Sequence, residues 1–334
     1  MKASLNHLRM RFPRLMAVLL CTLLLGGCSQ LLPDPVRSAQ STLVPGVDTV
    51  LPDAEPAEAA TSLREVTLYF RYEDQPYLAP ETRSLTVAPD EPFELALLRE
   101  LAQGPSPSSV QLTSALPEGC LILSVAAQGR TLFVTLSNNI LAGWSDEPAT
   151  WEQDPYWQVE APLRRQLCMQ SIVATITENC NYDGVQMLVE QTDVLSDSLR
   201  LRQSWFLDGS GDDVLTSPLI RQEQYLLTPS NTLRAALNAW STQELSVLYG
   251  YLAAADRPSY EDFTTFMQEA PRLINFGFTG GSVSPDGGTT LYTLHLYTQH
   301  QGVSKEWSGR IMCLVREGDL WKIPWTQFTG WMEE

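Results

Sequence analysis

FELALLRELAQGP, residues 93–105, has the spacing of a short helix that ends abruptly. Phe93, Leu97 and Leu101 recur every four residues, so they share one face of an α-helix. Asp90 precedes this stretch in the position of a helix cap. Gly104 and the proline after it predict the end of the helix, because glycine accepts a left-handed backbone and proline cannot continue the hydrogen bonding.

Extended runs and a second helix surround this stretch. Residues 66–70 and 82–87 have strand composition, and residues 121–136 alternate as a hairpin whose apolar positions begin at Leu121. Met169, Ile172, Val173 and Ile176 have the spacing of one helix face, and a last strand is expected at residues 185–189. Together these runs predict an α+β unit at residues 63–190, in which two helices cover an antiparallel sheet.

Several short motifs in this unit resemble the GerMN domain of sporulation and spore-germination lipoproteins. They are Leu68-Tyr69-Phe70, Arg83 before a strand, Leu97 to Leu101 leading into Gly104-Pro105, Leu116-Pro117-Glu118-Gly119, and Ser171-Ile172-Val173-Ala174-Thr175. The resemblance implies an extracytoplasmic interaction module, similar to the ring-building folds of secretion and sporulation channels. The chain departs from the pattern in a Trp-rich insertion before the second helix and in having a single copy of the module. Neither departure favours ring assembly.

A polar connector at residues 191–227 leads to a second unit at residues 228–334. Three helices are expected before residue 271, with caps at Ser230, at Ser241 paired with Glu244, and at Ser259 paired with Asp262. Four extended runs joined by short turns then predict a curved antiparallel meander, at residues 273–279, 289–298, 307–316 and 320–328. Helices followed by such a sheet resemble, in topology, the nuclear-transport-factor-2-like cone fold.

Residues 1–27 have the layout of a secretion signal, with basic residues before an uncharged apolar run. Gly26-Gly27-Cys28 after Leu25 resembles the bacterial lipobox, which implies cleavage between Gly27 and Cys28 and a lipid on the Cys28 thiol. The alternative is a short membrane helix with an incidental cysteine. The apolar run has roughly 11 residues, whereas crossing a bilayer takes about 20, which favours the lipobox.

The region at residues 28–62 is rich in Pro, Ala, Ser, Thr and acidic residues and has no aromatic residue, so we expect a disordered tether. The formal net charge is −17, and loss of the signal with its four basic residues would leave about −21. Such a polyanion is a poor ligand for nucleic acid and for an anionic bilayer. We therefore expect the lipid to hold the protein on the extracytoplasmic face of the cell membrane.

Four cysteines remain beyond the signal and the lipidation site: Cys120, Cys168, Cys180 and Cys313. Their spacing matches no zinc motif. If Cys168 and Cys180 share one helix they lie about 18 Å apart, beyond the roughly 7 Å limit for a disulfide. Two interpretations stay open, namely buried free thiols and a bridge that uses Cys120 or Cys313.

The Trp-rich insertion and an acidic loop are candidate binding sites. The aromatic residues Trp144, Trp151, Tyr156 and Trp157 can stack on a sugar or a partner surface, or pack inward. Residues 208–213 place side chains with oxygen ligands at alternate positions, as calcium-binding loops do. However, Asp213 stands at position six of the loop, where an EF-hand requires glycine, and Leu219 stands at position twelve, where it requires glutamate. An EF-hand is thus excluded, which leaves a looser calcium site or a solvated turn.

His295 is the candidate for a general base, because it shares a strand face with Thr293 and Tyr297 that would line the pocket of a cone fold. An ordinary strand histidine is the other interpretation. The sequence therefore predicts a non-enzymatic surface lipoprotein, without cofactor or metal, that binds an envelope protein or peptidoglycan in sporulation, germination or envelope maintenance. The alternative is a small-molecule-binding or enzymatic C-terminal domain that uses His295.

Overall fold

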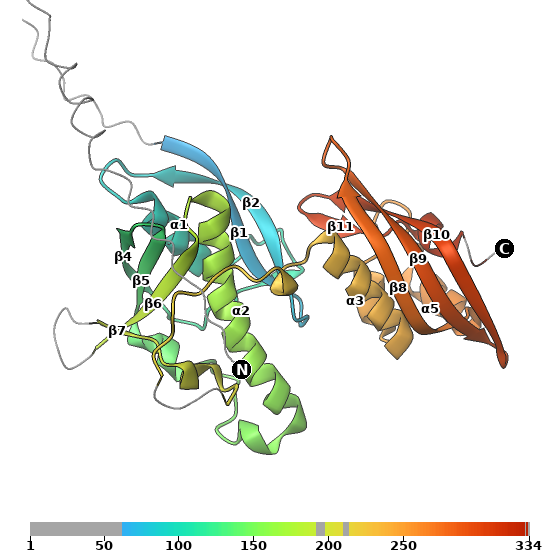
Figure 1. Ribbon diagram of the computed structural model, residues 1–334, viewed down its shortest axis with the longest axis horizontal. Coiled ribbons are helices and arrows are strands. Elements are labelled where there is room, and N and C mark those ends of the chain that lie inside the picture. Colours follow the sequence, from blue (N-terminus) through green and yellow to red (C-terminus); the bar gives the residue numbers. More distant parts are fainter. Residues whose placement is uncertain (1–61, 192–197, 210–213, 331, 333–334) are drawn as a thin grey trace, which may run out of the picture. The chain divides into compact units, whose positions relative to one another are not determined.

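The computed structural model describes residues 62–191, 198–209, 214–330 and 332 (Figure 1). The predicted α+β class is confirmed, with two sheets in the N-terminal part and a curled four-stranded sheet in the C-terminal part. The predicted signal, Cys28 and nearly all of the tether lie outside these residues. None of the helices within these ranges combines the length and the apolar composition needed to cross a bilayer.

The N-terminal part contains one sheet with strand order β2-β1-β3 and another with order β4-β5-β6-β7. Buried leucines of the first helix, including Leu97 and Leu101, confirm the predicted apolar face. The strands are β1 (Ser62–Tyr72), β2 (Leu78–Val87), β3 (Leu112–Thr113), β4 (Ile122–Gln128), β5 (Thr131–Leu136), β6 (Gly184–Glu190) and β7 (Ser198–Arg200). The helices are α1 (Phe93–Ala102) and α2 (Pro155–Asn179), with 3-10 turns η1 (Asn138–Ala142) and η2 (Trp151–Gln153).

Side chains of α2 bond to the backbone of β1 at Thr67 and Tyr69, where the second edge of β1 pairs with no strand of the described residues. Asn179 accepts from Thr67 N at 2.9 Å through Oδ1 and donates to Thr67 O at 2.7 Å. Thr175 Oγ1 accepts from Tyr69 N, and Ser171 Oγ donates to Tyr69 O at 2.6 Å. The three α2 residues are four positions apart, so one helix face satisfies these backbone groups. This explains why the Ser171-to-Thr175 motif contains two hydroxyl residues among apolar ones.

The second sheet is not purely antiparallel, because β5 and β6 run parallel. The predicted antiparallel arrangement is wrong for this one pair. Strands joined by a tight turn must be antiparallel, whereas the 25-residue helix α2 between β5 and β6 is a crossover long enough to bring the chain back in the same direction.

The β4–β5 hairpin is present, with one shift in the predicted alternation. Leu132, Val134 and Leu136 of β5 are buried as expected. In β4, however, Ile122 is buried and Leu121 is 58% exposed. The pairing of β4 with β5 is irregular between Ile122 and Ser124. Side chains that precede this point in the chain therefore lie on the face opposite to the predicted one.

The connector adds to the N-terminal sheet. Strand β7 pairs with β6, and Leu219 forms a bridge with Val185 in which each backbone N–H donates to the other carbonyl at 2.8 Å. The 3-10 turn η3 (Gln203–Phe206) places Trp205 and Phe206 in the hydrophobic core. A second 3-10 turn, η4 (Glu223–Tyr225), ends the connector.

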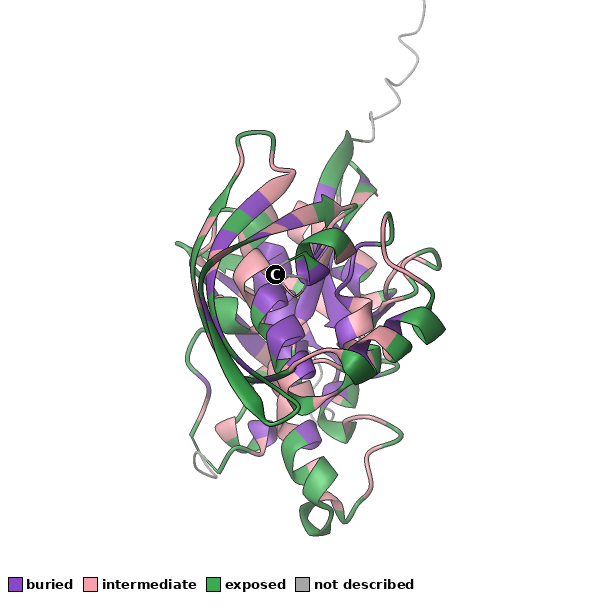
Figure 2. Cartoon of the chain, turned by 90° about the vertical axis from the view of Figure 1, so that its right-hand side faces the viewer, coloured by how far each residue is buried: buried purple, intermediate pink, exposed green. Residues whose placement is uncertain are grey.

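The C-terminal part has the three predicted helices, α3 (Pro229–Thr242), α4 (Leu245–Gly250) and α5 (Tyr260–Glu269), before an antiparallel sheet with strand order β11-β10-β9-β8. Figure 2 shows buried residues concentrated where the helices meet the inner side of the curved sheet. The strands are β8 (Arg272–Val283), β9 (Thr289–His300), β10 (Val303–Glu317) and β11 (Leu320–Lys322). The last predicted run is largely wrong, because Pro324 ends β11 and starts the short helix α6 (Trp325–Thr329).

Three predicted caps do not form. Pro92 has an extended backbone with ψ 132°, so α1 begins after it and Asp90 lies too far upstream to cap. Helix α3 has proline at its first position, so Thr228 caps it, accepting from Asn231 N, and Ser230 lies inside the helix. Ser241 also lies inside α3, where its hydroxyl donates to a backbone carbonyl. The cap at Ser259 is confirmed, since its Oγ accepts from Asp262 N at 3.1 Å.

Candidate functional site

His295 lies on the outer face of the C-terminal sheet. Its neighbours along β9, Leu294 and Leu296, are fully buried on the inner face, whereas His295 is exposed. The interior that a cone pocket would occupy holds large side chains, including Trp240 and Phe263, both 0% exposed. Packing of this kind fills the space that a general base on the inner face would need, and it leaves His295 in solvent.

The Trp-rich insertion between β5 and α2 is tied to α2 by ion pairs. Arg165 donates to both oxygens of Glu147 at 2.8 Å, and this pair is nearly buried. Arg164 donates to Asp146 at 2.7 Å. Two-point arginine–carboxylate contacts fix orientation as well as distance, so the insertion is held in one position on the helix.

Glu160, on the first turns of α2, joins this network to β1. Its carboxylate accepts from Arg71 at 2.5 and 3.1 Å and from Arg164 Nε at 2.7 Å. Burial favours the neutral acid, but the two guanidinium groups outweigh it and hold the pKa of Glu160 below its usual value. The carboxylate is therefore an ionised anchor, surrounded by positive charge, and is a poor general acid.

The four candidate aromatic residues divide into two groups. Trp144 packs against the hydrophobic core, with the Arg165 guanidinium 5.6 Å from its ring centre. Trp151 is half-buried in η2. Tyr156 and Trp157 meet edge to face at the start of α2, and Arg164 covers Trp157 at 4.9 Å. Tyr156 is 57% exposed, so it is the member of the set best placed for contact with a partner.

Val159 extends the exposed surface at Tyr156. It is 70% exposed and lies three residues further along α2, which places it on the same side of the helix. We call these two residues the α2 apolar surface. Sequence reasoning missed Val159, although an apolar residue three positions after an exposed tyrosine is a recognisable signal once the helix start is known.

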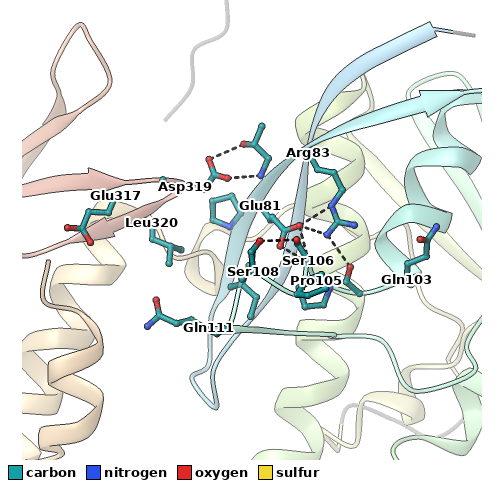
Figure 3. A pocket seen from close by; sticks show the side chains of 18 residues that line it. Glu81, Arg83, Gln103, Pro105, Ser106, Ser108, Gln111, Glu317, Asp319 and Leu320 are labelled. Atoms are coloured by element: carbon teal, nitrogen blue, oxygen red, sulfur yellow. Dashed lines mark hydrogen bonds and ion pairs between the residues drawn. The ribbon is translucent and has the colours of Figure 1, made fainter. Parts of the chain in front are cut away.

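The largest cavity that we describe, about 800 Å³, is lined by β2, residues 103–112 and the turn between β10 and β11 (Figure 3). Its acids are all engaged by backbone N–H groups. Glu81 accepts from Ser106 N at 3.0 Å and pairs with Arg83, Asp319 accepts from the N–H and hydroxyl of Thr82, and Glu317 accepts from two backbone N–H groups of residues 254 and 255. These carboxylates hold loops in place, which leaves them unsuited to acid–base chemistry.

The four cysteines have free thiols. Burial raises the pKa of Cys120 to about 11, and it raises that of the fully buried Cys168 as well, so both thiols are weak nucleophiles near neutral pH. Within the described ranges, no three Asp, Glu, His or Cys side chains are grouped so as to hold a metal ion. Residues 210–213 of the acidic loop lie outside those ranges.

Residues 67–194 match the family model Germane, described as sporulation and spore germination. The match confirms the predicted GerMN-like domain, and it covers less than half of the chain. No curated protein matches the sequence.

Three solved structures are similar to parts of the chain. The tandem GerMN domains of the sporulation protein GerM from Bacillus subtilis share 16% identity at a TM-score of 0.31, over 55% of this chain and half of that one. A Clostridium perfringens protein named as a lipoprotein shares 21% identity at 0.26, over 49% of this chain and 90% of that one. An LEH-like epoxide hydrolase from M. tuberculosis shares 16% identity at 0.21, over 30% and 87%.

Proposed function

We propose that this protein acts in sporulation, spore germination or envelope maintenance, because its GerMN-like domain relates it to proteins of sporulation and spore germination. We propose that this protein is a non-enzymatic lipoprotein, anchored through Cys28 on the extracytoplasmic face of the cell membrane. Its GerMN-like domain binds an envelope protein or peptidoglycan.

The α2 apolar surface is the observation that carries this proposal. Tyr156 and Val159 expose apolar area that contributes little to the fold. They lie in the N-terminal half of α2, which ion pairs connect to the insertion. A solvent-facing aromatic residue beside an aliphatic one provides contact area, and a tyrosine loses little conformational entropy on binding because it has two side-chain torsions. The engaged carboxylates and the exposed position of His295 further support binding over catalysis.

The binding proposal is tested with the double variant Tyr156→Ser/Val159→Ser. Wild type and variant are crosslinked on intact cells, partner proteins are identified by mass spectrometry, and binding to purified peptidoglycan is measured by co-sedimentation. We expect the variant to lose the partner while its melting temperature stays unchanged. The matched control is Ile274→Ser/Leu291→Ser, which removes two apolar residues of similar exposure from the C-terminal sheet. An identical partner set for both double variants would contradict the proposal.

The non-enzymatic part of the proposal is tested at His295. We expect His295→Gln to keep both the fold and the cellular phenotype, because removing an exposed strand side chain costs less than about 1 kcal/mol. A general base contributes roughly 10² to 10⁴ in rate. Loss of the phenotype in a fully folded His295→Gln protein would thus show an enzymatic role.

A further inference from the structure

A second cavity, of about 410 Å³, opens in the N-terminal part among η1, β6, β7 and η3. This volume is within the range of roughly 300 to 1,000 Å³ that small-molecule sites occupy. The apolar part of its lining is formed by Leu141, Val189, Leu199, Leu201, Trp205 and Leu207. Of these, Val189, Leu201 and Trp205 are buried, which gives the cavity an apolar wall that belongs to the core.

Arginines provide the charge of this cavity. Arg165, Arg200 and Arg202 line it, with Glu190 as the acid among the lining residues, on a protein whose formal net charge is −17. Arg200 and Arg202 are exposed. Glu147 pairs with Arg165, and Arg202 has an interaction of its own, so the charge that would attract an anion to this cavity rests on Arg200.

Arg165 adds an unsatisfied donor. Its two terminal nitrogens bond to Glu147 and to Ala161 O, and its guanidinium lies 5.8 Å from the ring centre of Trp205. Its Nε is buried and has no hydrogen-bond partner among the described residues. A buried donor without an acceptor costs about 1 to 3 kcal/mol, and a small shift that brings in a ligand oxygen would recover this energy.

We propose that this cavity binds a carboxylate carried on an apolar group. The carboxylate lies against Arg200 and the Arg165 edge, and the apolar group lies against Leu199 and Trp205. Glu147 already neutralises Arg165, and Glu190 adds a negative charge, so the site suits a single negative charge better than a doubly charged phosphate. The inference does not depend on the α2 apolar surface, since neither of its two residues lines the cavity.

Calorimetry on the full-length protein in detergent tests the site with 3-phenylpropionate, its neutral amide 3-phenylpropionamide, and phenyl phosphate. We expect saturable binding of the carboxylate with a Kd below a few millimolar, and binding of the other two that is at least about tenfold weaker. The dipeptide acetyl-Ala-Leu, compared with its carboxamide, tests whether a peptide carboxyl terminus is the source of the carboxylate. Binding of 3-phenylpropionate but not of the dipeptide acid would assign the site to a free small acid.

Two variants tie the binding to the cavity. Arg200→Gln is expected to raise the Kd for 3-phenylpropionate about tenfold, whereas Arg272→Gln, which changes an exposed strand arginine of β8, leaves it unchanged. Leu199→Trp fills the apolar part while it keeps the charges, and it is expected to weaken binding as well. Equal affinity for acid and amide, or an unchanged Kd in both Arg200→Gln and Leu199→Trp, would overturn the proposal.

Discussion

Lys322, on β11, places its ammonium group inside the protein, at 5% exposure. Its Nζ donates to Gly250 O at 2.7 Å, to the Tyr72 hydroxyl at 3.1 Å and to Gln111 Oε1 at 3.2 Å. Burial lowers the pKa of Lys322 to about 8, although the nearby carboxylate of Glu73 opposes this shift. The three acceptors satisfy the ammonium hydrogens, but they do not replace the hydration that a charged lysine loses.

The shift predicts a specific dependence of stability on pH. Between pH 8 and 10.5 the native state has released the Lys322 proton while the unfolded chain still binds it, so the free energy of unfolding rises with pH. The slope from this residue approaches about 1.4 kcal/mol per pH unit and vanishes below pH 8. We therefore expect the free energy of unfolding of Lys322→Met to rise less steeply with pH than that of wild type. Urea unfolding between pH 7 and 9.5 measures both slopes.

Lys305→Met is the control for this measurement, because Lys305 is exposed and its loss leaves the slope in place. The measurement stops below pH 10, since burial raises the pKa of Tyr72 above its ordinary value of 10 and makes stability fall at higher pH. A slope that is the same in wild type and Lys322→Met would show that the native lysine keeps its proton.

The sequence predicted which side chains are buried better than it predicted the hydrogen-bond partners of those side chains. The spacing of Met169, Ile172, Val173 and Ile176 predicted a buried helix face, and all four are 0% exposed. The hydrogen bonds of Ser171 to β1 could not be predicted, because they depend on which strand lies beside the helix. Lys322 was missed for the same reason, since its acceptors lie up to 250 residues away.

At the level of elements, the two predicted capping boxes give a matched pair for an experiment. Ser259 caps α5, whereas Ser241 lies near the end of α3 and donates to Asn238 O. We expect Ser259→Ala to lower the free energy of unfolding by about 1 kcal/mol, because an N–H of the first turn of α5 loses its acceptor. Ser241→Ala is expected to change it by less than about 0.5 kcal/mol, since alanine suits a helix interior. Equal effects in chemical denaturation would contradict these cap assignments.

The pattern of Ser with an acid three residues later is identical at both positions, so local sequence could not separate them. The outcome depends on where the preceding helix ends. Helix α3 runs to Thr242 and ends at Gln243 in the left-handed conformation, which leaves no room for a cap at Ser241. Two prolines carried signals that the expected boundaries did not use, since Pro229 starts α3 and Pro324 precedes α6 within the run that was expected to be a strand.

For the whole molecule, the connector changes where the N-terminal domain should be cut. A fragment of residues 62–227 retains β7, the Leu219 bridge and the core residues Trp205 and Phe206, whereas residues 62–190 lack all of these. We expect both fragments to fold, with the shorter one at least several kcal/mol less stable, because each buried aromatic residue contributes about 1.5 to 3 kcal/mol. Thermal unfolding measures the difference. Equal melting temperatures would mean that the connector packs on the domain without stabilising it.

The proposed anchor is tested at the same scale. We expect Cys28→Ala to move the protein from the detergent phase to the aqueous phase in Triton X-114 partitioning, because acyl chains on the thiol would be its membrane attachment. Cys120→Ala is the control, since that thiol is buried in the fold. Detergent-phase partitioning of Cys28→Ala equal to that of wild type would exclude lipidation as the anchor.

The class of fold followed from periodicity and turn residues. The packing of the connector could not be predicted in this way, because its composition is mostly polar although two of its aromatic residues, Trp205 and Phe206, belong to the core. The parallel β5–β6 pair was also missed, since direction is decided by the path of α2 and leaves no mark on the strands themselves. The aromatic residues of the insertion were proposed as a binding surface from the sequence alone. The cavity lined by Arg165 and Arg200 could not be proposed in that way, because its lining comes from separate segments of the chain.

The pairing of β6 with β7 and with Leu219 has a consequence for biosynthesis. Ribosomes extend a chain from its N-terminus, so β6 emerges about 30 residues before Leu219, which at 5 to 20 residues per second is roughly 2 to 6 s. During that interval its apolar edge is open to pairing with another nascent chain. We expect chains stalled near residue 195 to aggregate more than chains stalled beyond residue 227, as sedimentation of ribosome-released products would measure. Synthesis of the connector therefore ends the aggregation-prone period of the domain that precedes it.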